Sequence, residues 1–550
     1  MSRHSIHNDR AEAAPVQRSQ WLAQLPRNLY TTAQVRALDT EAIEACGIPA
    51  FELMTRAAAA VLWHVLERWP AVRHLLVFAG TGNNAGDGYL VAALGREQGL
   101  RATVLEVGDV DRLGPDARLA RAQALSAGVP MWAMESPQSQ QASELAGDTV
   151  VIDALLGIGQ AGPVRPSMQQ AIARINAQQV PVVAVDIPSG LCADTGVVQG
   201  VAVRATLTVC LIALKQGLLT AQGPDHTGEL VVDDLNLPQA LWHGAIGSAP
   251  ACQRVDIHSE AGRLAARPLT AHKGLAGQVL VIGGDTGMGG AALLAAEAAG
   301  RAGAGIVRLL TRQAHVAAVL ARRPEIMVQA MESLEAAGDQ ALRALLEGAT
   351  AIVIGPGLGR TALARQLLNA VLTQTGPEQA LLLDADALNL LAESQQERLQ
   401  IAPDGAPVHG LRRRQWVLTP HPGEAARLLC STTAAVQADR FAAVRQLQAR
   451  WGGVVLLKGA GSLICHEADG AQQLSLCTEG NPGMASGGMG DVLAGLTGGL
   501  LAQGMPAAEA LTLAVCVHGE AADRAAQADG ERGLLASDLL PHVRHLLNRR

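Results

Sequence analysis

The chain has 550 residues, of which 49% are hydrophobic and 17% charged, and its formal net charge is −7. This length favours two or more domains, and the hydrophobic content is that of a globular protein. The negative charge argues against nucleic acid or an anionic membrane as the main partner, so we expect small-molecule ligands.

The N-terminal half follows a repeated pattern of strands and helices. Residues 1–26 lack the apolar centre of a signal peptide, and we expect them to form a mobile extension. Thr31 and Gln34 fit a helix capping box. Continuous apolar runs, typical of strands buried on both faces, then alternate with helical segments. These runs are HLLVFAG (74–80), RATVLEV (101–107), TVVIDALLG (149–157), VPVVAVDIPSG (180–190), ATLTVCLIAL (205–214) and GELVVDDL (228–235). They predict a doubly wound parallel sheet in a Rossmann-like three-layer α/β sandwich.

Polar residues gather at the ends of these predicted strands. The segment AGTGNNAGDG (79–88) follows a strand and precedes a helix, so its amides can face an anion. Its glycines fit neither a dinucleotide fingerprint nor a Walker A loop. Asp153 and Asp186 end two further strands, and Ser189 follows closely. Oxygen donors from three strand ends suit a hard cation or general acid/base chemistry. An ordinary turn with buried, capped aspartates is the alternative interpretation.

A second series of strands begins after residue 265. Residues 244–265 lie in a proline-containing stretch without a clear period and are predicted to be a linker. The apolar runs that follow predict a second three-layer α/β domain. They are QVLVIGG (278–284), GIVRLLT (305–311), TAIVIGPGLG (350–359), ALLLDADAL (380–388), QWVLTPHPGE (415–424) and GVVLLKG (453–459).

The cysteines and the longest apolar stretch bear on the location of the chain. Eight cysteines are scattered without a CxxC pair, which indicates reduced residues of a cytoplasmic protein. The stretch from Val492 to Val517 is interrupted by polar residues and a proline, so it is a poor membrane span and suits a pair of buried helices.

The second half also places chemistry-bearing residues after its strands. His421 stands between two prolines in a rigid turn, and Lys458 precedes glycines that can hold a nucleotide. GNPGMASGGMGDVLAG (480–495) offers amides at a helix N-terminus that can stabilise a transferring phosphoryl group. Asp491 can take a proton from an attacking hydroxyl, although a simple helix cap is the alternative interpretation.

The order of these motifs resembles a known enzyme family. GTGNNAGDG, DALLGIGQAGPVR and VDIPSG resemble the epimerase half of the bifunctional NAD(P)H-hydrate repair enzymes. HKG, VIGG, GPGLG, DADALN, TPHPGE, KGAGS and GGMGD resemble the dehydratase half, which uses ADP or ATP and has a ribokinase-like fold. The resemblance implies an epimerase domain at 27–243 and an ADP-dependent dehydratase domain at 266–550.

For the first domain, the resemblance implies interconversion of the R and S hydrates of NADH and NADPH. The residues implied to bind the hydrated nucleotide are Asn83, Asn84, Ala85, Gly86, Asp87, Gly157, Ile158, Gly159, Gln160, Ala161, Gly162, Pro163 and Asp186. Asn84, Asp153 and Ser189 are implied to bind potassium. We assign the proton transfer to Asp186. The family usually has two glycines where this chain has Ala85 and Gly86.

For the second domain, the resemblance implies dehydration of the S hydrate with ADP, which gives AMP and phosphate. The implied contacts with the hydrated nucleotide are Ala291, Gly357, His421 and Asp491, and those with ADP are Lys458, Gly459, Ala460, Gly461, Ser462 and Gly490. Asp491 is expected to deprotonate the ring hydroxyl for attack on ADP. Met489 stands where relatives often have threonine. Magnesium is expected with the nucleotide, and we also expect a homo-oligomer.

Two other functions stay open from the sequence. A ribokinase-like small-molecule kinase would share GGMGD but would not need the NNAGDG domain. A non-catalytic nucleotide-sensing protein would keep both folds without the chemistry. The presence of Asp186, His421, Lys458 and Asp491 argues against the second alternative.

Overall fold

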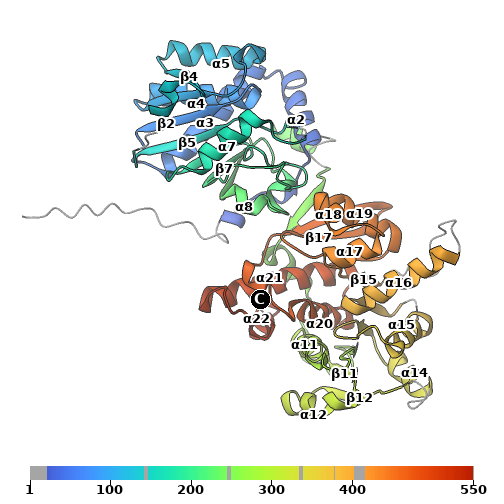
Figure 1. Cartoon of the computed structure of the whole chain (residues 1–550). Coiled ribbons are helices and arrows are strands. Elements are labelled where there is room, and N and C mark those ends of the chain that lie inside the picture. The colour runs from blue at the N-terminus through green and yellow to red at the C-terminus, as the bar shows by residue number, and fades with distance from the viewer. Residues whose placement is uncertain are drawn as a thin grey trace, which may run out of the picture. The chain divides into compact units, whose positions relative to one another are not determined.

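A computed structural model describes residues 21–141, 146–160, 162–244, 249–333, 339–376, 378–401 and 415–548. The chain divides into two compact units, Met1–Ala251 and Cys252–Arg550 (Figure 1). Most of the expected N-terminal extension lies outside the described residues, whereas Leu22 and Leu25 are buried. No helix in the described part of the chain is long and apolar enough to cross a membrane.

The first unit contains a parallel sheet. Its strands are β2 (His74–Ala79), β3 (Arg101–Glu106), β4 (Met131–Ala133), β5 (Thr149–Ala154), β6 (Val182–Val185), β7 (Leu207–Leu211) and β8 (Glu229–Asp233). They lie in the order β4-β3-β2-β5-β6-β7-β8, and every neighbouring pair is parallel. All six predicted runs form strands; β4 is short and partly exposed, and it has no apolar run to predict it. The order reverses between β2 and β5, where doubly wound folds bind their ligands.

Helices cover both faces of this sheet. The longer ones are α2 (Thr32–Glu44), α3 (Ala50–Arg68), α4 (Asn83–Glu97), α5 (Pro115–Ser126) and α7 (Pro166–Asn176). The expected capping box of Thr31 and Gln34 starts α2. Alternate side chains of β2 point to opposite faces: Leu75 and Val77 belong to the apolar cluster with α3, α4 and α5, and Leu76 and Phe78 to the cluster with α7. The predicted three-layer sandwich is therefore confirmed. The short elements are β1 (Asn28–Leu29), η1 (Val110–Arg112), α6 (Pro137–Gln141), η2 (Gln216–Leu219), α8 (Gly223–Thr227) and α9 (Gln239–His243).

The second unit contains a mixed sheet. Seven parallel strands are β10 (Gln278–Ile282), β11 (Ile306–Thr311), β12 (Met327–Ala330), β13 (Ala351–Ile354), β14 (Ala380–Leu383), β15 (Trp416–Leu418) and β16 (Val454–Leu457). The antiparallel strands β17 (Ser462–Ala468) and β18 (Ala471–Cys477) follow β16. The order β18-β17-β16-β15-β14-β13-β10-β11-β12 reverses between β10 and β13. The six predicted strands are all present.

Part of the predicted linker is folded. Within 244–265, β9 (Cys252–Val255) pairs in parallel with β18, and α10 (Ile257–Glu260) and η3 (Ala261–Arg263) follow it. Asp256 caps α10 in a capping box with Ser259. These elements are too short to produce a hydrophobic period in the sequence.

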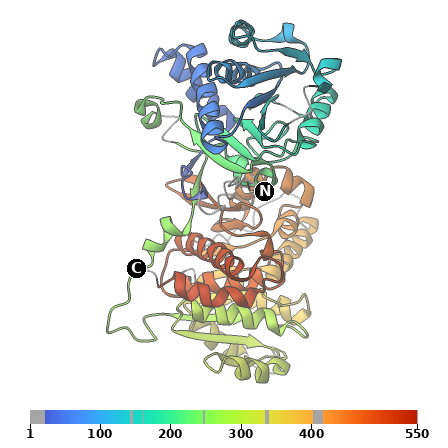
Figure 2. The same ribbon diagram turned by 90° about the vertical axis from the view of Figure 1, so that its left-hand side faces the viewer.

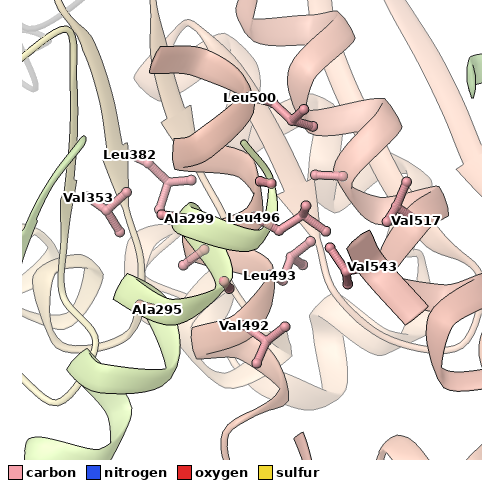
Figure 3. Packing of buried hydrophobic residues seen from close by; sticks show 14 of the residues in the cluster. Ala295, Ala299, Val353, Leu382, Val492, Leu493, Leu496, Leu500, Val517 and Val543 are labelled. Atoms are coloured by element: carbon pink, nitrogen blue, oxygen red, sulfur yellow. The ribbon is translucent and has the colours of Figure 1, made fainter. Parts of the chain in front are cut away.

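Small residues bring two helices of the second unit into close contact. The helices α11 (Gly289–Arg301), α20 (Met489–Ala502), α21 (Ala507–Asp529) and α22 (Leu539–Leu546) pack together (Figure 2). Their buried side chains contribute to one apolar cluster (Figure 3). A β-carbon on Gly495 of α20 would lie 1.9 Å from the carbonyl oxygen of Ala295 on α11. The abundance of alanine and glycine thus has a packing reason here, and the predicted pair of buried helices is α20 and α21.

Other helices connect the strands of the second unit. They are α12 (Gln313–Arg322), α14 (Asp339–Glu347), α15 (Ala362–Gln374), α16 (Ala385–Ile401), α17 (Pro422–Leu428), α18 (Thr433–Ala438), α19 (Arg440–Trp451), η4 (Pro482–Met484) and η5 (Ala536–Asp538).

Candidate active sites

A cavity of about 780 Å³ opens beyond the carboxyl ends of β2, β5, β6 and β7 in the first unit. Many of the residues that line it were predicted to bind the hydrated nucleotide: Asn83, Asn84, Asp87, Gly157, Ile158, Gly159, Gln160, Pro163 and Asp186. Of the rest of that set, Gly162 is exposed with a φ of 75°, and Ala161 lies outside the described residues. The cavity coincides with the reversal of strand order.

The Asn-rich segment is the first turn of a helix rather than a loop. Helix α4 begins at Asn83, with Gly82 as its N-cap. Ala85 is fully buried in the apolar cluster, so its methyl group lies in the core. A β-carbon on Gly86 would lie 2.5 Å from the Met54 sulfur, so a larger residue at this position would have to displace the Met54 side chain of α3.

Asp153 and Ser189 form a buried pair of oxygen donors. The Ser189 hydroxyl donates to Asp153 Oδ1 at 2.6 Å, and the Ser189 amide donates to Asp153 Oδ2 at 2.8 Å. Burial raises the pKa of Asp153 to about 6, although the hydrogen bonds from Ser189 oppose this shift. Asn84 Nδ2 is buried without a hydrogen-bond partner among the residues that the structure describes.

Asp186 forms an ion pair that the sequence analysis missed. Its backbone has a φ of 69°, and its carboxylate accepts from the Leu211 amide at 3.0 Å and from Lys215 Nζ. Only 1% of the Lys215 side chain is exposed. Burial alone would lower the pKa of Lys215, but Asp186 and the Cys210 thiol raise it overall. The available signal in the sequence was the scarcity of lysine. Of the 43 lysines and arginines in the chain only three are lysines, and Lys215 is one of them.

Two further carboxyl groups line the same cavity. Burial, followed by the carboxylates of Asp186 and Asp39, raises the pKa of Asp87 well above its usual value. Burial and Asp186 also raise the pKa of Asp39, which lies on α2 and was not predicted. The cavity therefore combines one buried ammonium with several carboxyl groups, a set that can hold or move protons.

In the second unit, Lys458 and Asp384 form the centre of a cluster. Lys458 Nζ lies 2.8 Å from Asp384 Oδ1, which also accepts from the Thr419 hydroxyl at 2.8 Å. A β-carbon on Gly490 would lie 3.4 Å from Lys458 Nζ, so the N-terminus of α20 approaches this ion pair. Burial would lower the pKa of Lys458, but Asp384 and Glu424 raise it overall.

Asp491 stands in the first turn of α20 but is not its N-cap. Gly488 occupies the N-cap position with a φ of 92°. Burial, followed by the charge of Asp384, raises the pKa of Asp491 to about 7, while Lys458 opposes the shift. Met489 is buried in the apolar cluster and packs in the core. Asp491 is thus poised to exchange a proton near neutral pH.

His421 and Glu424 share a capping box at the start of α17. The Gly423 amide donates to His421 Nδ1 at 2.9 Å, and the His421 amide donates to Glu424 Oε2 at 2.8 Å. Burial, followed by Lys458, lowers the pKa of His421, and burial raises the pKa of Glu424 to about 7. Glu424 was not predicted as a site residue, although its capping-box spacing to His421 is visible in TPHPGE.

The predicted ADP-binding segment is a turn between antiparallel strands. Residues 458–461 connect β16 to β17, and Ser462 is the first residue of β17. The buried Arg440 donates to the carbonyl oxygens of Leu457 at 3.3 Å and Gly461 at 3.2 Å. A β-carbon on Gly459 would lie 2.7 Å from Arg440 Nη1, so the turn packs against the guanidinium. Arg440 is a supporting residue that no sequence motif indicated.

The remaining predicted residues adjoin this cluster. A β-carbon on Gly357 would lie 3.1 Å from the β-carbon of Ala291, which places both at the reversal between β10 and β13. Gly355 follows the same strand, β13, and a β-carbon on it would lie 1.8 Å from the carbonyl oxygen of Asp384 at the end of the neighbouring β14. The structure thus brings Lys458, Gly490, Asp491 and His421 around Asp384, with Ala291 and Gly357 along the same edge.

Comparisons with known proteins match both units. Residues 50–217 match the family model described as YjeF-related protein N-terminus, and residues 279–544 match NAD(P)H-hydrate dehydratase. The "Bifunctional NAD(P)H-hydrate repair enzyme Nnr" of Coxiella burnetii is 44% identical, over 94% of this chain and 99% of that protein. The protein of the same name from Vibrio cholerae is 41% identical, over 95% of this chain and 99% of that protein. The one from Escherichia coli is 40% identical, over 95% of this chain and 95% of that protein.

A solved structure is also similar to part of this chain. The ADP/ATP-dependent NAD(P)H-hydrate dehydratase of Bacillus subtilis, co-crystallised with ATP and Mg²⁺, is 27% identical, with 53% of this chain and 95% of that chain covered and a TM-score of 0.43.

Proposed function

The chain belongs to the family of bifunctional NAD(P)H-hydrate repair enzymes, and from this premise we propose how its residues divide the two reactions. The first unit is the epimerase, which interconverts the R and S hydrates, and the second unit is the dehydratase. The observation that supports the division is that each predicted residue set gathers at the carboxyl ends of the parallel strands of its own sheet. The expected cytoplasmic location and homo-oligomeric state stay predictions.

In the epimerase, Asp186 serves as the proton-transfer residue. The hydrate forms when water adds to a carbon-carbon double bond of the dihydronicotinamide ring. The carbon that takes the hydroxyl is also bonded to the ring nitrogen. Protonation lets this hydroxyl leave as water, and return of water to the other face inverts the carbon. Asp186 lines the cavity and is held in place by Leu211 and Lys215, so it is fixed for this role.

Potassium is proposed at Asn84, Asp153 and Ser189. The chemistry of these donors fits a hard cation, because Asp153 and Ser189 supply oxygens only 2.6 Å apart in a buried place. A cation there would also compensate the burial of the Asp153 carboxylate. When bound, potassium would contribute a fixed positive charge beside the nucleotide.

In the dehydratase, Asp491 takes the proton from the ring hydroxyl, whose oxygen then attacks the terminal phosphorus of ADP and releases AMP. The resulting ester loses phosphate, and the neighbouring ring carbon loses a proton, which restores the double bond. The amides at the start of α20 and the Lys458 ammonium stabilise the negative charge of the transferring group. His421 contacts the hydrated ring, and the turn at 458–462, with Gly490, holds ADP.

Magnesium would accompany ADP, because phosphoryl transfer requires neutralisation of the developing charge. Glu424 fits as the carboxylate that holds it: the side chain is buried, burial raises its pKa to about 7, and a nearby dication would favour its ionised form.

Separated R and S hydrates test the function. With ADP present, the S hydrate should return NADH absorbance directly, and the R hydrate should do so after conversion by the first unit. Accumulation of a phosphorylated small molecule without recovery of NADH would instead establish a kinase.

A further inference from the structure

Two of the three lysines of this chain stand at its candidate sites. Lys215 and Lys458 each pair with an aspartate that ends another strand of the same sheet, Asp186 and Asp384 respectively. Elsewhere the chain uses arginine, since only Lys215, Lys273 and Lys458 are lysines. A lysine ammonium is a compact point charge, whereas the guanidinium of arginine is broad and planar. A lysine side chain therefore fits a narrow buried position in which its ammonium must contact a single carboxylate.

Lys215 is held in place at the wall of the epimerase cavity. It follows β7, which is the neighbour of β6, and Asp186 stands at the end of β6. Lys215 Nζ donates to Asp186 Oδ1 and to the Leu211 carbonyl oxygen, the latter at 2.6 Å. It also lies 3.6 Å from the Cys210 sulfur. These contacts fix the ammonium at one place beside the carboxylate.

Asp186 needs such support because its backbone is strained. A φ of 69° is unusual for a residue other than glycine and persists only where the surroundings enforce it. The Asp186 amide donates to the Val209 carbonyl at 2.9 Å, and its carboxylate accepts from the Leu211 amide at 3.0 Å. These hydrogen bonds with β7, together with Lys215, fix the direction of the Asp186 carboxylate. Asp186 and Lys215 both line the cavity.

A purely structural ion pair explains this arrangement less well. Buried ion pairs contribute little net stability, and apolar residues of similar size often replace them without loss. Here the pair lies at the cavity that also holds the carboxyl groups of Asp39 and Asp87. A fixed positive charge at this position holds the Asp186 carboxylate in one orientation among the carboxyl groups that line the cavity.

We propose that Lys215 is the positioning residue of the epimerase, which aims the Asp186 carboxylate at the hydrated ring. This inference rests on the proposed function and names a residue that acts through Asp186 without reacting itself. The groups that face Asp186 are Lys215 and Cys210 from β7 and its following loop, Asp39 from α2, and Asp87 from α4.

Lys215→Met tests the proposal in the full-length protein. With the R hydrate and ADP, turnover should fall about 100-fold in kcat, as for a misplaced reacting group, with a smaller change in KM. Turnover of the S hydrate should stay unchanged, since the second unit is intact. Arg96→Met, which removes an exposed charge at the far end of α4, is the matched control.

Two further variants keep the test decisive. Lys215→Met in the Asp186→Asn background should cause no additional loss if Lys215 acts through Asp186. Lys215→Arg should not restore turnover of the R hydrate, because the closed site fits only a compact charge. If Lys215→Met does not fold, a folded Lys215→Arg variant tests the proposal by itself. Full R turnover, or a loss confined to KM, in a folded Lys215 variant would overturn the inference. Absence of S turnover in the unaltered protein would instead refute the proposed function.

Discussion

Lys458 Nζ lies 2.8 Å from Asp384 Oδ1, and this ion pair faces the first turn of α20. A β-carbon on Gly490 would lie 3.4 Å from the ammonium, within van der Waals contact, so the first turn of α20 lies directly beside Lys458. The helix N-terminus and the ammonium thus present positive charge to the same place, where an anionic phosphoryl group is stabilised. Asp491 is the carboxylate beside that place.

Asp491→Asn should abolish dehydration of the S hydrate. The amide keeps the shape of the side chain but cannot accept the hydroxyl proton, so we expect a loss of about 10²- to 10⁴-fold in turnover. Recovery of NADH absorbance from pure S hydrate and ADP measures it. Interconversion of R and S, followed chromatographically without ADP, should continue at the normal rate. Retention of most S turnover would exclude Asp491 as the base.

The dehydratase should gain activity as the pH rises through about 7. Burial and the charge of Asp384 raise the pKa of Asp491 to about 7. Since the base acts in its ionised form, it is mostly protonated below that pH and mostly competent above it. The profile of kcat/KM for the S hydrate should therefore rise with pH and level off. A flat profile between about pH 6 and 8 would contradict this role.

Asp153→Ala should stop consumption of the R hydrate and spare the S hydrate. The substitution removes the carboxylate that accepts from the amide and the hydroxyl of Ser189, and with it the proposed potassium site. Turnover of each hydrate with ADP, in potassium chloride and in choline chloride, measures the effect. The unaltered protein should lose R turnover without potassium, and the variant should be insensitive to the change. Equal loss of R and S turnover would contradict the assignment of one reaction to each unit.

Arg440→Lys should weaken ADP binding. The guanidinium reaches the carbonyl oxygens of Leu457, Lys458 and Gly461 together, and a lysine ammonium cannot span all three. A looser turn should raise the KM for ADP about tenfold, the loss that supporting residues of a binding site commonly show. Initial rates across ADP concentrations at saturating S hydrate measure it. An unchanged KM for ADP would show that the turn keeps its shape without Arg440.

The sequence predicted strand ends better than the contacts between them. Continuous apolar runs marked every long parallel strand, and polar residues at their ends located both sites, because parallel strands deliver their carboxyl ends to one edge. Lys215 and Arg440 were missed because their roles depend on partners 29 and 17 or more residues away, which no local motif encodes. The hairpin of β17 and β18 was missed because exposed residues interrupt its apolar pattern.

Gly495→Ala should destabilise the second unit. A β-carbon on Gly495 would lie 1.9 Å from the carbonyl oxygen of Ala295, so α20 and α11 must move apart. Overpacking of this kind typically costs about 1–3 kcal/mol of unfolding free energy, which exceeds the gain of less than about 1 kcal/mol from alanine in a helix. Gly290→Ala on α11 is the matched control, because a β-carbon there would meet nothing within 4 Å. The urea concentration that halves S turnover should fall for Gly495→Ala and hold or rise for Gly290→Ala. Equal midpoints would mean that the helix pair tolerates the extra methyl group, and that its close approach does not account for the glycine at 495.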